Sequence, residues 1–314
     1  MSIYAPPREH GHLEGTDTGL LAAVVAGQAR LTLDQGLTLL RSMPLTGLGR
    51  WADARCRAVH GDAIRTYVID RNINYTNVCT AKCTFCAFRR DGDETDAYTL
   101  EQGALLAKIE ELVAIGGTQI LMQGGMNPAL GLEWYVDLLR AIKARFPKVH
   151  VHGFSPPEFI EFVRFFDPPG ATLEDKIRWV MVRLRDAGLD SVPGGGGEIF
   201  APAVRRKIGL GKCDADAWLT TMYVAHSLGM FTSATMMFGH VETLEERVEH
   251  LERLRVLQDE THGFKAYICW TFQPDHTDMS HVPPAGSFEY LRTQAISRLY
   301  LDNIPNIQSS WVTQ

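Results

Sequence analysis

The stretch TYVIDRNINYTNVCTAKCTFC, residues 66–86, joins a β-rich run directly to three closely spaced cysteines. The run over 66–73 is rich in β-branched and aromatic side chains, which predicts a strand. Cys79, Cys83 and Cys86 then follow, spaced four and three apart. Thiolates select zinc or iron–sulfur clusters, and one C-x-x-x-C-x-x-C without a second pair is not the pattern of structural zinc. Three ligands on one loop predict a metal centre with a position left for a substrate or cofactor.

The rest of the chain repeats this alternation of a short β-rich run with a helical pattern. Further strands are predicted over 118–125, 148–154, 189–195, 231–239, 264–272 and 306–312. Helical spacing of apolar residues occupies 99–115, 131–146, 172–187, 214–228, 243–259 and 286–302. Polar or glycine-rich segments follow the strands, which favours an α/β fold, a TIM-like (β/α) barrel whose loops build one shared site. We expect the last β/α unit of a closed barrel to be absent from this chain.

The first part of the chain does not fit the alternation. Residues 1–65 predict a helical N-terminal extension, and residues 66–314 the barrel core. Helical spacing is found over 31–43 and 48–61, with Thr32 and Asp34 as start signals and Gly61 as a stop.

Composition narrows the class of protein. The chain has 314 residues and a formal net charge of −6, which gives no broad electrostatic reason to expect nucleic acid. No run of basic residues indicates a membrane surface, and the N-terminus lacks the order of a signal peptide, so a cytoplasmic location is expected. In that reducing compartment the isolated Cys56, Cys213 and Cys269 are expected to be small, at least half-buried apolar residues.

The segment PGGGGE, residues 193–198, follows the fourth predicted strand. It has neither the ending of a P-loop nor dinucleotide-binding glycine spacing. Every glycine raises the entropy lost on ordering, so we interpret Gly195 and Gly196 as places where a cofactor or substrate approaches the backbone. Glu198 then offers a carboxylate for a ribose hydroxyl or for proton transfer; the alternative is a solvated surface glutamate.

Two other strand ends carry polar candidates. The second predicted strand ends in Gln123, Gly124 and Gly125, which could admit a ligand or form an ordinary turn. The third is followed by Ser155 and Glu158, which either line a cavity or form the capping box of a helix.

Histidines accompany the third and fifth strands. His240 and Glu242 follow the fifth strand, where they could meet a substrate; Thr243 and Glu246 beside them also read as a capping box. His150 and His152 alternate with valines on the third strand, so both point to one face. They are either substrate contacts in the barrel lumen or hydrogen-bonded core histidines.

The cysteine spacing, with Phe85 directly before the last cysteine and a barrel strand before the first, resembles the radical S-adenosylmethionine superfamily. The resemblance extends through HGFSPPE, GLDSVPGGGGEI, ATMMFGHVET, CWTFQP and NIQSSWVTQ, and is greatest for the cyclase family of the futalosine route to menaquinone. It implies that Cys79, Cys83 and Cys86 bind three irons of a [4Fe–4S] cluster. S-adenosylmethionine then chelates the fourth iron.

The resemblance also implies roles for residues around the cluster. Phe85 is expected against the adenine or as loop packing, and residues 123–125 near the methionine amino group. Ser155, Gly195 and Gly196 are expected on the cofactor side of the cavity. The implied reaction cyclises dehypoxanthine futalosine to cyclic dehypoxanthinyl futalosine after a 5′-deoxyadenosyl radical removes the C4′ hydrogen. Glu198, His240 and Glu242 are the candidates for the base that removes the ring proton.

Three alternatives stay open. The sister families, aminofutalosine synthase and FO synthase, share several of these segments. A zinc-binding interaction module could use the same cysteines and one histidine. The chain could also be a fragment that folds without turning over. For the enzyme reading, the expected partners are a small-molecule substrate and an electron donor such as flavodoxin or ferredoxin, with no nucleic acid and no membrane.

Overall fold

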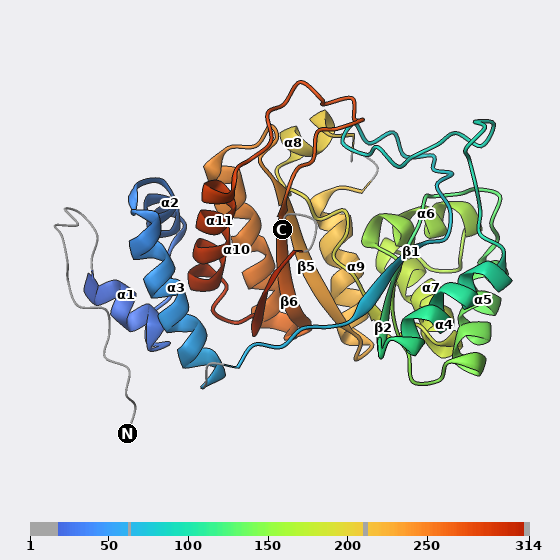
Figure 1. The fold of residues 1–314 in the computed structure, drawn as a ribbon, viewed down its shortest axis with the longest axis horizontal. Helices are drawn as coiled ribbons and strands as arrows, with labels where there is room; N and C mark the ends of the chain where they lie inside the picture. Colours follow the sequence, from blue (N-terminus) through green and yellow to red (C-terminus); the bar gives the residue numbers. More distant parts are fainter. Residues whose placement is uncertain (1–17, 62–63, 210–212, 311–314) are drawn as a thin grey trace.

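A computed structural model describes residues 18–61, 64–209 and 213–310. Seven parallel strands form one sheet in the order of the chain, curled into a half-barrel (Figure 1). The strands are β1 (Asp70–Asn74), β2 (Gln119–Gln123), β3 (His150–Gly153), β4 (Ser191–Val192), β5 (Phe231–Phe238), β6 (Phe264–Thr271) and β7 (Asn306–Ser309). All seven predicted strands are therefore confirmed, and the described part of the sheet has β1 and β7 as its edges.

Helices connect successive strands and cover the outer face of the sheet, as the alternation predicts. They are α4 (Gln102–Ala114), α5 (Leu132–Arg145), α6 (Pro156–Phe166), α7 (Leu173–Ala187), α8 (Pro202–Lys207), α9 (Ala215–Ser227), α10 (Leu244–Thr261) and α11 (Ser287–Tyr300). Among these connecting helices, α8 was not predicted, and α6 was predicted only through its possible capping box at Ser155 and Glu158. No helix in the described ranges is both long and apolar enough to cross a membrane.

The two faces of the sheet differ in polarity. Ile120, Met122 and Val151 point to the helices and are fully buried. The alternate positions, which include His152 and Ser233, point to the concave face and bond to each other. A strand buries side chains of opposite character on its two faces because successive residues point opposite ways. The concave face is thus polar where β3, β4 and β5 meet.

The first helices are α1 (Thr18–Val25), α2 (Leu33–Ser42) and α3 (Leu45–His60). Thr32 caps α2 in a capping box with Gln35, and Gly61 ends α3 in the left-handed conformation, as predicted. The helices α2 and α3 lie beside α10 and α11 (Figure 1). Arg292 of α11 donates to the carbonyl of Met43 at 2.6 Å. The division of the chain at residue 65 stays a prediction.

Candidate functional site

The three cysteines lie on the loop that follows β1, at the end of the half-barrel where all the strands end. The Cys79 amide donates to the Arg90 carbonyl at 3.1 Å, and the Thr80 amide to the Met126 carbonyl at 3.0 Å. Gly125 packs against the loop so closely that a Cβ there would lie 2.1 Å from the Val78 carbonyl oxygen. The backbone of the neighbouring strand end therefore holds the loop in place.

The thiols are half-buried and close enough to influence one another. Burial raises the pKa of Cys83 to about 12, and the neighbouring Cys86, Cys79 and Glu198 add to the rise. Such thiols give up their protons when a metal binds. Within the described ranges, no three His, Cys, Asp or Glu side chains are gathered around a single ion position. A [4Fe–4S] cluster takes each thiolate on a different iron, and three neighbouring thiols on one loop are a donor set that fits such a cluster.

The glycine segment 194–197 is held by the buried guanidinium of Arg205 on α8. Arg205 donates to the carbonyls of Gly197 at 2.9 Å and Gly196 at 3.0 Å. From the other side, the Ser233 hydroxyl accepts the Gly194 amide at 3.2 Å. Gly196 has a φ of +77°, and a Cβ there would lie 2.2 Å from the Pro157 ring. Conformation and space therefore both require glycine at this position.

Glu198 at the end of this segment is 4% exposed, so it is not a solvated surface residue. Its Oε1 atom accepts the Gly196 amide at 3.0 Å, and its Oε2 atom has no hydrogen-bond partner among the described residues. Burial raises the pKa of this carboxyl to about 7, although Arg205 opposes the rise. A buried oxygen without a partner is costly unless a ligand binds it. Glu198 thus suits a hydroxyl or proton donor supplied by a ligand.

The ends of β2, β3 and β4 meet beside this segment. A Cβ on Gly195 would lie 2.5 Å from the Gln123 Nε2 atom and 3.3 Å from the Ser155 Cβ. Three residues predicted from separate stretches of sequence are therefore neighbours. Their roles toward a cofactor stay predictions.

Ser155 and Glu158 form the capping box of α6. The Ser155 amide and hydroxyl both donate to Glu158 at 2.7 Å. The other carboxylate oxygen accepts the Tyr75 hydroxyl at 2.7 Å and the Gly124 amide at 3.3 Å. Of the two predicted roles for this pair, the structure therefore shows the helix capping box. Through the same bonds, Glu158 connects the segments that follow β1, β2 and β3.

Protein packing alone also accounts for the glycines of the second strand end. A Cβ on Gly124 would lie 2.5 Å from the Tyr75 ring, and one on Gly125 would meet the cysteine loop. The close approach inferred from these glycines is to the protein's own chain, on the side that a Cβ would occupy.

His240 and Glu242 have side chains that are fully buried, with His240 Nδ1 3.1 Å from Glu242 Oε2. The other oxygen of Glu242 accepts Arg247 at 2.7 Å and the Gly239 amide at 2.6 Å. Burial would raise the pKa of Glu242, but His240 and Arg247 outweigh it, so the pKa is lowered. The predicted capping box of Thr243 and Glu246 starts α10. This pair is engaged within the protein, unlike Glu198.

The remaining residues singled out from the sequence lie in several parts of the fold. Phe85 is half-buried and packs against the hydrophobic core. His150 and His152 share one face of β3, as predicted, and both bond to the Ser191 hydroxyl at 2.6 Å. They are hydrogen-bonded histidines, although His150 is exposed. Cys213 and Cys269 are buried and Cys56 half-buried, as expected.

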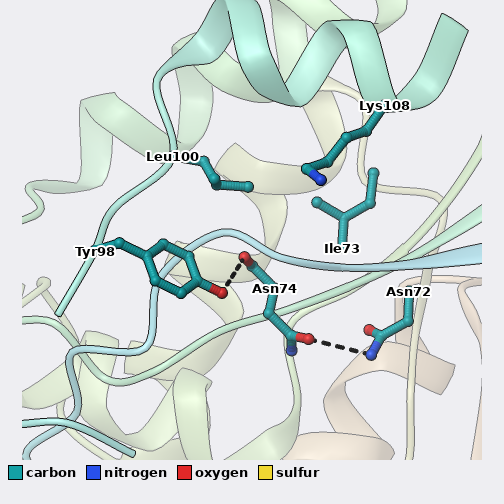
Figure 2. A pocket seen from close by; sticks show the side chains of 6 residues that line it. All are labelled: Asn72, Ile73, Asn74, Tyr98, Leu100 and Lys108. Carbon is teal, nitrogen blue, oxygen red and sulfur yellow. Dashed lines mark hydrogen bonds between the residues drawn. The ribbon is translucent and has the colours of Figure 1, made fainter. Parts of the chain in front are cut away.

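A cavity of about 310 Å³ lies at the free edge of β1 (Figure 2). Its described lining residues are Asn72, Ile73, Asn74, Tyr98, Leu100 and Lys108. The Tyr98 hydroxyl donates to the Asn74 carbonyl at 3.2 Å, and the Asn72 and Asn74 side chains bond to each other. None of the residues singled out from the sequence is among these. The cavity adjoins the root of the cysteine loop through Tyr98, whose carbonyl accepts Thr76 at 2.6 Å.

Sequence reasoning missed two residues that support the site. Arg205 bonds to the glycine segment, and Tyr75 bonds to Glu158. The α8 helix has only six residues, so no periodicity distinguishes the buried Arg205 from the exposed Arg206 beside it. Tyr75 follows a strand that is too short to reveal which face it joins.

Two protein-family models match this chain. Residues 73–254 match the family described as the radical SAM superfamily, and residues 261–314 match the CofH/MqnC C-terminal region. A cyclic dehypoxanthine futalosine synthase of Halalkalibacterium halodurans is 42% identical over 94% of this chain and 78% of that protein. An aminodeoxyfutalosine synthase of Thermus thermophilus is 39% identical over 93% of this chain and 78% of that protein.

Two solved structures share the fold at low sequence identity. The hydrogenase maturase HydG has a TM-score of 0.71 and 15% identity, over 95% of this chain and 65% of that chain. Methylornithine synthase PylB has a TM-score of 0.69 and 18% identity, over 91% of this chain and 77% of that chain. With the cysteine loop, the half-barrel and these matches together, the chain belongs to the radical SAM superfamily.

Proposed function

We propose that this protein is a radical SAM cyclase that joins C4′ of the sugar of dehypoxanthine futalosine to its benzoate ring. The observation that carries the proposal is that a three-cysteine loop and a glycine segment ending in a buried, partly unpartnered Glu198 meet at one end of the half-barrel. The 42% identity to a protein named for this cyclisation supports the choice of substrate.

In this proposal Cys79, Cys83 and Cys86 hold a [4Fe–4S] cluster. Gln123, Ser155 and Gly195, which are neighbours, would line the S-adenosylmethionine site, and Phe85 would pack beside it. When bound, the cluster and S-adenosylmethionine supply a radical able to remove a hydrogen atom from carbon. The barrel end contributes orientation and the exclusion of water from the reacting sugar and ring.

Glu198 is the residue we propose to take the proton from the ring. A general base works best with a pKa near the working pH, and the pKa of Glu198 is raised to about 7 by burial. Its Oε2 atom has no partner among the described residues. His240 and Glu242 are less suited, because each already bonds within the protein and Arg247 keeps Glu242 ionised.

Anaerobic reconstitution with iron and sulfide, followed by incubation with S-adenosylmethionine, a reductant and dehypoxanthine futalosine, tests the proposal. We expect 5′-deoxyadenosine and the cyclic product in equal amounts. Cys83→Ser is the matched inactive control, because it removes one cluster ligand and leaves the rest of the site. Formation of 5′-deoxyadenosine without any cyclic product would exclude the cyclase.

A second reaction has comparable support from identity. The aminodeoxyfutalosine synthase is 39% identical over nearly the same part of the chain. Offering its enol-ether substrate in a parallel incubation separates the two reactions, since only one of the substrates should be consumed. A colourless protein containing one zinc and no sulfide would instead favour the zinc-binding module.

A further inference from the structure

A line of hydrogen bonds crosses the concave face of the sheet from β3 to β5. His150 Nε2 lies 2.6 Å from the Ser191 hydroxyl, and that hydroxyl lies 2.6 Å from His152 Nδ1. His152 Nε2 lies 3.2 Å from the Ser233 hydroxyl. That hydroxyl also accepts the Gly194 amide at 3.2 Å. Four side chains on three strands therefore form one continuous line.

The line runs from solvent toward the proposed active site. His150 begins β3 and is exposed, whereas Ser191 and Ser233 are 5% and 8% exposed. Ser233 at the inner end contacts the first glycine of the segment that carries Glu198. The parallel register pairs His152 with Ser191, which brings the histidines and serines to the same face.

Both directions of the line satisfy the three ring nitrogens that belong to it, His150 Nε2 and both nitrogens of His152. In one, His150 donates to Ser191, Ser191 donates to His152 Nδ1, and His152 Nε2 donates to Ser233. In the other, Ser233 donates to His152 Nε2, His152 Nδ1 donates to Ser191, and Ser191 donates to His150 Nε2. Imidazole and hydroxyl groups can switch between such states, because each both donates and accepts. A proton entering at one end can therefore leave at the other.

The surroundings keep the inner ring neutral. Burial lowers the pKa of His152 to about 3, and the nearby His150 lowers it further. At the outer end, the charged groups that act on His150 are Asp190, which raises its pKa, and Lys143, which lowers it. These two form an ion pair with each other. Partial burial leaves the pKa of His150 lowered overall, so this ring too is neutral near neutral pH.

We propose that His150, Ser191, His152 and Ser233 form a proton relay that delivers to solvent the proton released during the cyclisation. The inference rests on the proposed function. In that reaction the C4′ hydrogen leaves as an atom to the deoxyadenosyl carbon, and a C4′–ring carbon bond forms. The ring C–H bond would then break, its proton would pass to Glu198, and the remaining electron would need a one-electron acceptor, a role that the bound iron–sulfur cluster would supply. One proton per turnover must therefore leave Glu198, and Ser233 lies against the segment that holds this residue.

Two substitutions interrupt the relay while preserving most of the packing. His152→Gln keeps a donor and an acceptor between the two serines but cannot exchange protons as an imidazole does. Ser191→Ala removes the link between the histidines, and Ser191→Thr retains the hydroxyl. His226→Gln is the matched control, because His226 also bridges two hydroxyls, those of Thr261 and Thr232, at 2.6 and 2.7 Å. His226 belongs to α9 on the outer side of the sheet.

The experiment follows a single turnover of the reconstituted enzyme in weak buffer, with a pH-indicator dye for the released proton and quenched samples for the cyclic product. We expect His152→Gln and Ser191→Ala to slow proton release about tenfold or more. Added imidazole should restore the rate in His150→Ala, whose exposed position makes it the variant least disturbing to folding. Ser191→Thr and His226→Gln should release protons at the wild-type rate.

Equal proton-release rates in the wild type, His152→Gln and Ser191→Ala would overturn the relay. Slower release in these variants without any rescue of His150→Ala by imidazole would also overturn it, because a purely structural role predicts that result. Absence of cyclic product from the wild type would instead reject the proposed function. The two failures are therefore distinguishable.

Discussion

Glu198 and Glu242 are both buried glutamates that follow a strand of the same half-barrel, yet their surroundings are opposite. Glu242 is bonded to Arg247, His240 and the backbone, and these partners lower its pKa. Among the described residues, Glu198 has one backbone partner and one oxygen without a partner, and burial raises its pKa to about 7. A fully paired carboxylate contributes to structure, whereas an incompletely paired one is available for a ligand.

The largest expected difference between Glu198 and Glu242 is in catalytic activity. Glu198→Gln should lower the rate of cyclic product formation by about 10²-fold or more, because the amide cannot accept the ring proton. Measured under the same anaerobic conditions, Glu242→Gln should retain most of its activity per folded molecule. If Glu242→Gln lost as much activity as Glu198→Gln, the distinction between the two sites would fail.

The next largest difference between Glu198 and Glu242 is in their contribution to the free energy of unfolding. Glu242→Gln should lower the free energy of unfolding by about 3 kcal/mol, because the buried Arg247 loses an ionic partner. Glu198→Gln removes no ion pair and should leave the unfolding free energy nearly unchanged near pH 4.5, where the Glu198 carboxyl is protonated in the folded state. Denaturant titration of the cluster-free protein measures both. Arg247 also forms an ion pair with Glu289 at 2.5 Å. If Glu242→Gln were as stable as the wild type, this second ion pair would be enough to stabilise the buried Arg247.

The smallest effect is in the pH dependence of stability. The folded-state pKa of Glu198, about 7, lies above the usual unfolded value. The folded state therefore keeps a proton that the unfolded state loses, and stability falls as the pH rises from about 4.5 to 7. Relative to Glu198→Gln, the wild type should lose about 2 kcal/mol of unfolding free energy between pH 5 and pH 8.

For Glu242 the sign is reversed. Its folded-state pKa is lowered, so its contribution is present above the unfolded pKa and is lost as the pH falls through the folded value. The same denaturant series, extended below pH 5, should show the Glu242→Gln variant losing less stability than the wild type. Parallel curves for the two proteins would contradict the lowered pKa.

The sequence predicted the fold well because each βα unit carries its own local signal. Seven strands and the principal helices follow from apolar periodicity and from punctuating glycine and proline residues. The β4 strand shortens to Ser191 and Val192 because Pro193 and the glycines follow directly. The α8 helix is too short for periodicity to reveal.

The sequence identified candidate residues of the site, but it did not predict the hydrogen bonds and ion pairs that they form. Cysteine spacing marks Cys79, Cys83 and Cys86 without any structure. In contrast, the difference between Glu198 and Glu242 depends on where the nearby arginines bond. Arg247 bonds to Glu242, whereas Arg205 donates to the carbonyls of Gly196 and Gly197. The direction in which an arginine side chain points leaves no mark in the sequence, so the two glutamates look alike there.

The packing of α2 and α3 against α10 and α11 has a consequence for biosynthesis. Arg255 and Arg292 donate to the carbonyls of Leu31 and Met43, across more than 220 residues of chain. At about 5–20 residues per second, the ribosome makes these partners tens of seconds after the first helices emerge. During that interval the apolar faces of α2 and α3 have no final partner, and they become available to whatever binds nascent chains. The helices α2 and α3 therefore wait for α10 and α11 before their apolar faces are covered.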